Sequence, residues 1–144
     1  MAFRFETLLK LRKNVEDLVQ KDFAGANSHL LNQQKRLGFM YEVEDDSKKE
    51  LGPRTRENVD IDTMYLYNHF FEGIHIQKNL QQKIISEISP KVEEKRKALA
   101  EAMRKRKTLE ILKEREQRAR RRERLKQETA LLDEAAATQW RRRL

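Results

Sequence analysis

The chain of 144 residues has no cysteine, two prolines and four glycines. Without cysteine it can form no disulfide and use no catalytic thiol, and the absence suits a reducing cytosol. Aromatic residues make up only 7% of the chain, so the composition does not predict one compact core. No apolar run approaches the ~18 residues of a membrane span. We expect no secretory signal peptide, because the N-terminus leads directly into a charged amphipathic pattern.

What the chain has in abundance is charge, at 39% of its residues. From Lys91 to Leu144 it contains neither glycine nor proline and consists mainly of Glu, Lys, Arg, Ala and Leu. This composition predicts one long helix, roughly 80 Å in length at about 1.5 Å per residue. A molecule built from such a helix is expected to act mechanically or as an adaptor.

Apolar residues recur with helical spacing in two segments. The first segment runs from about Phe3 into the forties, with four-residue steps between Leu11 and Phe23 that indicate a stutter in the coiled coil. Its predicted contact positions are Leu8, Leu11, Val15, Val19, Phe23, Ala26, Leu30, Leu37 and Met40. Those of the second segment are Met64, Tyr67, Phe71, Ile74, Ile85, Ile88, Val92, Leu99, Ala102, Leu109 and Leu112.

Between these segments the apolar pattern disappears, and Gly52-Pro53 supplies a turn signal. We predict a first helix over about 3–48, a turn region over about 49–60 and a second helix over about 61–140. Asp60 or Asp62 can cap the second helix. Neither helix can bury its apolar face alone, so the prediction is an all-α fold in which both form an antiparallel two-stranded coiled-coil hairpin, a single domain over residues 1–144.

If the turn centres on residue 55, position i lies opposite position 110 − i. This register would bring Phe39, Met40 and Tyr41 against Phe70 and Phe71, and Leu8 and Leu11 against Leu99 and Ala102. The second helix is the longer one, and Pro90 lies inside it, where proline removes a backbone hydrogen bond. We expect a kink near Pro90, since the apolar phase continues across it; a break into two helices is the alternative.

Positive charge is concentrated after the predicted paired region. Nineteen Lys and Arg but ten Asp and Glu lie at or after Lys91, densest between Arg115 and Lys126. The last 30 or so residues are therefore predicted to form a single basic helix that extends beyond its partner, which implies an acidic partner. Alternatively, neighbouring glutamates such as Glu114 neutralise this run as a solvated face. Leu125, Leu131, Leu132 and Trp140 are too few for a core and suit a partner's groove.

The sequence offers no chemistry of a catalytic site. His69, Glu72 and His75 lack the i, i+4 spacing of paired histidine ligands, and no cysteine completes a metal site. The four glycines are scattered singly, so they form no phosphate-binding loop. We expect no enzymatic activity, no cofactor, no metal and no small-molecule substrate.

Several segments together resemble the FliJ family of flagellar export proteins. They are the opening Phe3–Arg12, the run from Val92–Leu99 through Arg104–Glu114, and the late triplet Leu132-Asp133-Glu134. The resemblance covers the whole chain. It implies a stalk of the type III protein export apparatus that binds and stimulates a hexameric export ATPase, contacts the cytoplasmic part of a membrane-embedded export gate protein, and handles export chaperones. It also implies a cytoplasmic protein of flagellum biogenesis and motility, peripheral at the cytoplasmic face of the inner membrane.

The resemblance also assigns two sets of contact residues by position. The ATPase is expected to meet the chain termini and the basic extension, at Phe3, Phe5, Leu8, Arg115, Arg118, Arg121, Arg122 and Leu132. The export gate is expected to meet Gln33, Leu37, Met40 and Tyr41 on the first helix and Phe70, Ile74, Gln77 and Gln81 on the second.

Two other functions are weighed against this one. A nucleic-acid-binding coiled coil would use Arg115–Arg124 on phosphates, but no aromatic residue interleaves that run, so nucleic acid is not an expected partner. A lipid-surface helix around Trp140 would have only a short apolar face. Flagellar and injectisome stalks look alike at this level, and a hairpin can also pair between chains, so both questions stay open here.

Overall fold

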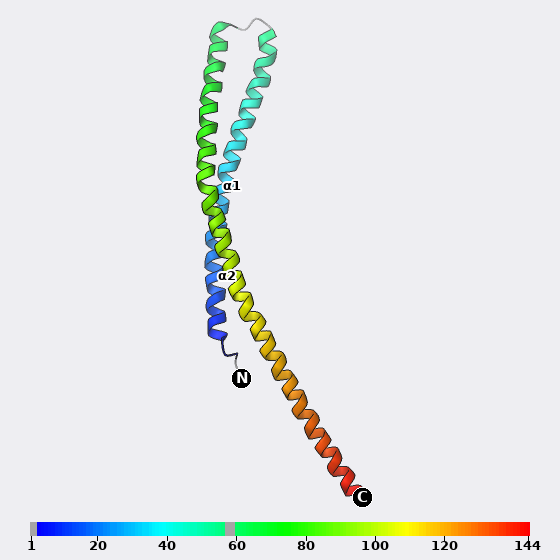
Figure 1. Ribbon diagram of the computed structural model, residues 1–144. Helices are drawn as coiled ribbons and strands as arrows, with labels where there is room; N and C mark the ends of the chain where they lie inside the picture. Colours follow the sequence, from blue (N-terminus) through cyan, green and yellow to red (C-terminus); the bar gives the residue numbers. More distant parts are fainter. Residues whose placement is uncertain (1–2, 57–59) are drawn as a thin grey trace. The chain divides into compact units, whose positions relative to one another are not determined.

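The computed structural model describes the backbone of residues 3–56 and 60–144 and the side chains of residues 3–52 and 60–144. Helix α1 spans Glu6–Arg56 and helix α2 spans Ile61–Arg143 (Figure 1). The described residues contain no strand. The all-α class, the antiparallel packing of two long helices and the greater length of the second, 83 residues against 51, are confirmed.

The helices contribute to two compact units. Unit 1 comprises residues 1–17 and 100–144, and unit 2 comprises residues 18–99. Each unit therefore contains part of α1 and part of α2. The single domain over residues 1–144 stays a prediction.

Helix α1 is longer than predicted. It continues eight residues beyond the expected end near residue 48 and passes through Gly52 and Pro53 to Arg56. A proline inside a helix removes one backbone hydrogen bond, but Leu51 remains half-buried on the contact face and Glu44 pairs with Lys48 one turn earlier. The predicted turn region of 49–60 was therefore too long; its positions 57–59 lie outside the described residues.

Each helix turns one line of residues toward the other, and we call this line the seam. Seam residues occupy positions a and d of a heptad repeat. On α1 the seam positions follow steps of three and four, are buried or half-buried, and are Leu9, Arg12, Glu16, Val19, Phe23, Ala26, Leu30, Gln33, Leu37, Met40, Glu44, Ser47 and Leu51. This spacing is that of an uninterrupted coiled coil.

The seam of α2 keeps the same spacing. Its positions are Met64, Tyr67, Phe71, Ile74, Lys78, Gln81, Ile85, Ile88, Val92, Lys95, Leu99, Ala102, Arg106, Leu109, Lys113, Glu116 and Arg120. All the apolar positions predicted for this helix lie on the seam except Leu112, which is 40% exposed. The positions that the apolar pattern missed are polar.

The predicted stutter in α1 was wrong. Leu11 is 55% exposed and Val15 is 38% exposed, whereas Leu9 is only 2% exposed. Arg12 and Glu16 take the next two seam positions. Glu16 can do so because it forms an ion pair with Arg106 of α2, a long-range contact that the periodicity of α1 does not reveal.

The predicted register was also wrong. Residue numbers of ion-paired partners on the two helices add up to 119–123 in unit 1 and 117–122 in unit 2, instead of 110. The reason is the longer α1, which moves the centre of the hairpin toward residue 60. Tyr41 therefore contacts Gln82 and not Phe70 or Phe71, and Glu6 pairs with Lys113 at 2.9 Å.

Two charged layers in the seam share the same spacing. In unit 2 Glu44 pairs with Lys78, and in unit 1 Glu16 pairs with Arg106. The two layers are 28 residues apart on each helix, which is four heptads. A slip by one heptad in either direction would place Glu44, Lys78 and Arg106 opposite apolar seam residues, where a charge without a partner is costly. We infer that these layers select the register.

Helix α2 is continuous through Pro90, so the alternative of a break into two helices is wrong. The hydroxyls of Ser86 and Ser89, in the turn before this proline, donate to the carbonyls of Gln82 and Ile85, each at 2.8 Å. Such bonds often bend helices. The kink itself stays a prediction.

At the start of α2, Asp60 occupies the N-cap position, and its backbone carbonyl accepts a hydrogen bond from the amide of Met64 at 3.1 Å. A capping bond by the side chain of Asp60 or Asp62 stays a prediction.

Candidate functional site

The residues predicted to meet an ATPase all lie in unit 1. At the N-terminus the rings of Phe3 and Phe5 meet edge to face, with centroids 5.8 Å apart, and the guanidinium of Arg4 lies 5.5 Å from the ring of Phe5. Phe5 is 40% exposed, whereas Phe3 and Leu8 are half-buried. The remaining five predicted residues lie on α2 and are exposed: Arg115, Arg118, Arg121, Arg122 and Leu132.

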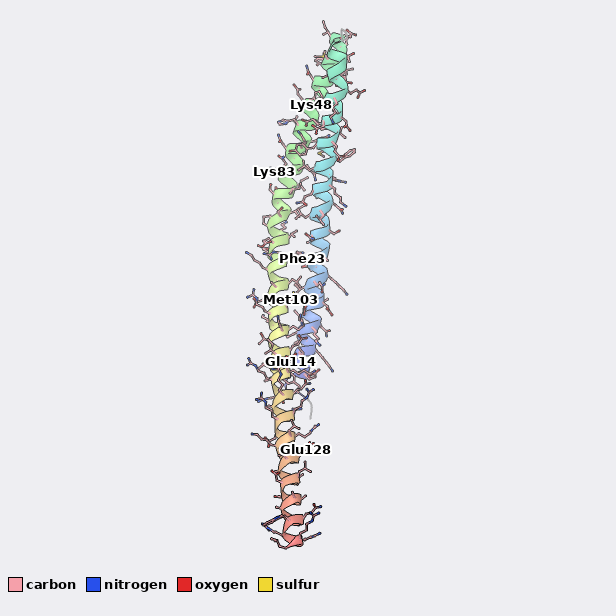
Figure 2. All side chains as sticks on the ribbon, turned by 90° about the vertical axis from the view of Figure 1, so that its right-hand side faces the viewer. Phe23, Lys48, Lys83, Met103, Glu114 and Glu128 are labelled. Carbon is pink, nitrogen blue, oxygen red and sulfur yellow. The ribbon has the colours of Figure 1, made fainter. Side chains whose placement is uncertain are left out.

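The predicted single-helix extension of α2 is present, and it begins later than residue 112. Lys113, Glu116 and Arg120 are still half-buried, and every residue of 121–144 is exposed. We call residues 121–144 the overhang. In Figure 2 the labelled Glu128 lies on a part of α2 with no second helix beside it. The boundary differs from the prediction because the register places the start of α1 beside Lys113.

Charges on the overhang have no ion-pair partner among the described residues. The overhang carries seven Lys and Arg and four Asp and Glu, and none of them pairs with another residue in the part of the chain that the structure describes. The alternative of neutralisation by neighbouring glutamates applies to two earlier arginines, since Arg118 lies 3.6 Å from Glu114 and Arg120 lies 2.6 Å from Glu116. Leu125, Leu131, Leu132 and Trp140 are 61–70% exposed. The overhang therefore offers unpaired cations and apolar side chains to a partner.

The residues predicted to meet an export gate all lie in unit 2. Ile74 and Gln81 are buried, at 7% and 5% exposed, because they are seam residues. Gln33, Leu37 and Met40 also belong to the seam and are half-buried. Tyr41, Phe70 and Gln77 are exposed. Of the eight residues, Tyr41, Phe70 and Gln77 are therefore the most accessible to a partner.

Gln81 is a polar seam residue that links the helices. Its side-chain amide donates to the side-chain oxygen of Gln33 at 2.7 Å and to the backbone carbonyl of Gln33 at 3.0 Å. These bonds satisfy a buried amide, which would otherwise be costly. Gln33 and Gln81 therefore support the hairpin in addition to any role at a binding surface.

Tyr41 lies at one flank of the seam in a small polar cluster. The ammonium of Lys78 lies 4.6 Å from the centroid of its ring, and Gln82 donates to its hydroxyl at 2.9 Å. Lys78 also pairs with Glu44, which Lys48 contacts at 2.8 Å. Hydrogen bonds from Lys48 and from Lys78 lower the pKa of Glu44 to about 2. This cluster keeps Tyr41 fixed although 43% of its surface is exposed.

The opposite flank of unit 2 is hollowed. A groove of about 450 Å³ is lined by Asn32, Lys35, Arg36, Phe39 and Met40 of α1 and by Gln81 of α2. A second hollow of about 210 Å³ is lined by Ser47, Leu66, Tyr67 and Phe70. Phe39 was considered in the sequence only as an aromatic near the turn. Its position at the groove, beside two cations, depends on the register and is visible only in the structure.

No metal-binding cluster is present among the described residues. They include no cluster of three His, Cys, Asp or Glu side chains that could hold a metal ion. His69 forms a hydrogen bond with the hydroxyl of Tyr65 at 2.9 Å, and His75 contacts Asn79 at 3.4 Å, both within α2. Within residues 3–56 and 60–144, neither helix has a segment long and apolar enough to cross a membrane.

Comparison with known proteins identifies the family of this two-helix chain. A family model described as the flagellar FliJ protein matches residues 1–144, which is the whole chain. The chain belongs to the FliJ family. The resemblance noted in the sequence is thereby confirmed. No significant match was found among curated proteins or among solved structures.

Membership of the FliJ family gives the chain a role connected with flagellar protein export. It also associates the chain with components of the flagellar export apparatus, and it decides the choice between flagellar and injectisome systems in favour of the flagellum. The two sets of contact residues that the FliJ resemblance assigned fall in different compact units, the ATPase set in unit 1 and the gate set in unit 2.

Proposed function

We propose that the protein is a non-enzymatic stalk and adaptor of the flagellar type III export apparatus. In this proposal it binds the hexameric export ATPase and stimulates ATP hydrolysis, contacts the cytoplasmic part of the export gate protein, and handles export chaperones. It works in the cytoplasm, peripheral at the cytoplasmic face of the inner membrane. The family match over the whole chain carries the proposal.

The overhang supports the ATPase part of this proposal. A helix with no second strand leaves its whole circumference free for a surrounding partner, and residues 121–144 are exposed on every side. Their unpaired Lys and Arg fit an acidic protein surface, because complementary charge steers and orients association. Exposed Leu131, Leu132 and Trp140 supply the apolar contact that an interface needs near its centre.

A charge-reversal experiment tests the ATPase part. The variant R121E/R122E/R124E changes three exposed arginines of the overhang, all beyond the last half-buried residue of α2. The matched control R104E/K105E/K107E reverses three exposed cations where α2 is paired with α1. We expect the overhang variant to lose stimulation of ATP hydrolysis by the purified cognate ATPase, and the control to retain it. Equal stimulation by the two variants would contradict the proposed role of the overhang.

The nucleic-acid alternative predicts a different result. Binding of the unchanged chain to duplex DNA would weaken linearly with salt on a log–log plot, with a slope set by the number of phosphates neutralised. We expect no measurable DNA binding at 150 mM salt. Tight binding at that concentration, lost in R121E/R122E/R124E, would instead favour a nucleic-acid partner.

A further inference from the structure

Unit 2 contains two stretches without acidic residues. Residues 23–41 of α1 and residues 73–86 of α2 contain neither Asp nor Glu, although 39% of the whole chain is charged. The stretches contact each other, since Gln81 donates to Gln33 and Gln82 donates to Tyr41. We call them the acid-free stretches. Their combined surface carries positive charge only.

Most of this positive charge is not neutralised within the chain. Of the four Lys and Arg in the acid-free stretches, Lys78 lies in the seam and pairs with Glu44. The other three are Lys35, Arg36 and Lys83, and in the described part of the chain none of them forms an ion pair. All three are exposed. Lys35 and Arg36 also line the groove of about 450 Å³.

Exposed apolar residues gather on the same flank of the seam. Phe39 lines the groove and is 66% exposed. Gln82 of α2 lies on the other flank of the seam, because it donates a hydrogen bond to Tyr41 there. The heptad repeat places Leu80 and Ile84 on the side of α2 away from Gln82, which is the flank of the groove. Leu80 is 57% exposed and Ile84 is 41% exposed. Exposed apolar side chains grouped beside charges are typical of an interaction surface.

We propose that this flank binds an acidic and apolar segment of the export gate protein's cytoplasmic part. Apolar side chains of that segment pack against Phe39, Leu80 and Ile84, while its carboxylates pair with Lys35 and Arg36. The inference rests on the proposed function in one respect, that unit 2 is the part of the chain that meets the gate. It adds the chemistry of the partner and places the contact on residues other than the buried seam positions.

The shape of the site favours a protein segment over the other acidic partners. Single-stranded nucleic acid binds to several aromatic platforms along a continuous basic groove, whereas the described residues that line this groove include a single aromatic side chain, that of Phe39. A membrane surface requires an extended apolar face on one helix, whereas this groove is formed by residues of both helices.

The test measures binding of the full chain to the purified cytoplasmic part of the cognate gate protein. The variant K35E/R36E reverses the two groove cations. K21E/K91E is the matched control, because Lys21 and Lys91 are exposed, form no ion pair with any described residue and lie in unit 2 outside the acid-free stretches. Both variants change the net charge equally, and circular dichroism confirms that each one folds. A third variant, F39A, tests the apolar contact.

We expect K35E/R36E to weaken binding at least tenfold and K21E/K91E to change it less than twofold. F39A is expected to weaken binding without altering its salt dependence. If the unchanged chain binds the gate and the two charge variants bind equally well, the acidic docking site is refuted while the proposed function stands. If the unchanged chain does not bind the gate, both fail. Binding of phosphatidylglycerol vesicles that depends on Lys35 and Arg36, with gate binding unaffected, would overturn the proposal in favour of a lipid surface.

Discussion

Replacing Leu9 with Ala should destabilise unit 1 far more than replacing Leu11 with Ala. The two leucines are two residues apart on the same helix, and Ala suits a helix as well as Leu does. Leu9 is 2% exposed in the seam, whereas Leu11 is 55% exposed outside it. The pair therefore isolates the effect of burial from that of helix propensity.

The expected difference in stability between L9A and L11A follows from the area that each leucine buries. Truncating a buried leucine to Ala generally costs about 2–5 kcal/mol, and a seam bordered by water on both sides places Leu9 near the lower end, at about 2–3 kcal/mol. Folding removes less than half of the Leu11 side chain from water, since 55% of it stays exposed. We therefore expect replacement of Leu11 with Ala to lower the free energy of unfolding by at most about 1 kcal/mol. Urea titration followed by circular dichroism at 222 nm measures both changes in the free energy of unfolding.

A local measurement shows whether the loss of stability in L9A occurs in unit 1. Amide hydrogen exchange in peptides covering residues 6–17 reports opening of the α1 segment of unit 1. We expect faster exchange there in L9A and little change in L11A. A larger effect of L11A than of L9A would refute the seam assignment and would support the stutter through Leu11 and Val15 that periodicity alone predicts.

Three further variants test the backbone and the charged seam. Gly25 and Gly38 lie inside α1 with no atom within 4 Å of an added Cβ, so G25A/G38A should raise the free energy of unfolding by about 1–2 kcal/mol; an unchanged melting temperature would contradict this. P90A restores a backbone donor inside α2 and should stabilise unit 2 by up to about 3 kcal/mol, and a lower melting temperature would show that the proline is favourable. Because the pKa of Glu44 is lowered to about 2, its contribution is complete above about pH 5 and is lost as the pH falls toward 2. Melting curves at pH 7 and pH 3 should therefore differ less in E44Q than in the unchanged chain. E42Q changes an exposed residue that pairs with no described cation, so it should not reduce the difference.

The sequence by itself determined the number of helices, their antiparallel pairing and the basic overhang. Helical periodicity is a local property, and the apolar positions of α2 from Met64 to Leu109 are regular enough to identify its buried face. The excess of arginine after Lys113 is equally visible without a structure. Both follow from neighbouring residues and need no knowledge of the second helix.

Only the tertiary structure decided the end of α1, the register and the phase of the seam near the N-terminus. Gly52 and Pro53 weaken a helix, but burial of Leu51 across the hairpin outweighs that local signal. Glu16 belongs to the seam because Arg106, 90 positions later, pairs with it. A polar residue can occupy a buried position when its partner is charged and close, and the sequence alone does not show which partner that is. The register in turn decides which exposed residues share a flank, and hence where the groove with Lys35, Arg36 and Phe39 is formed.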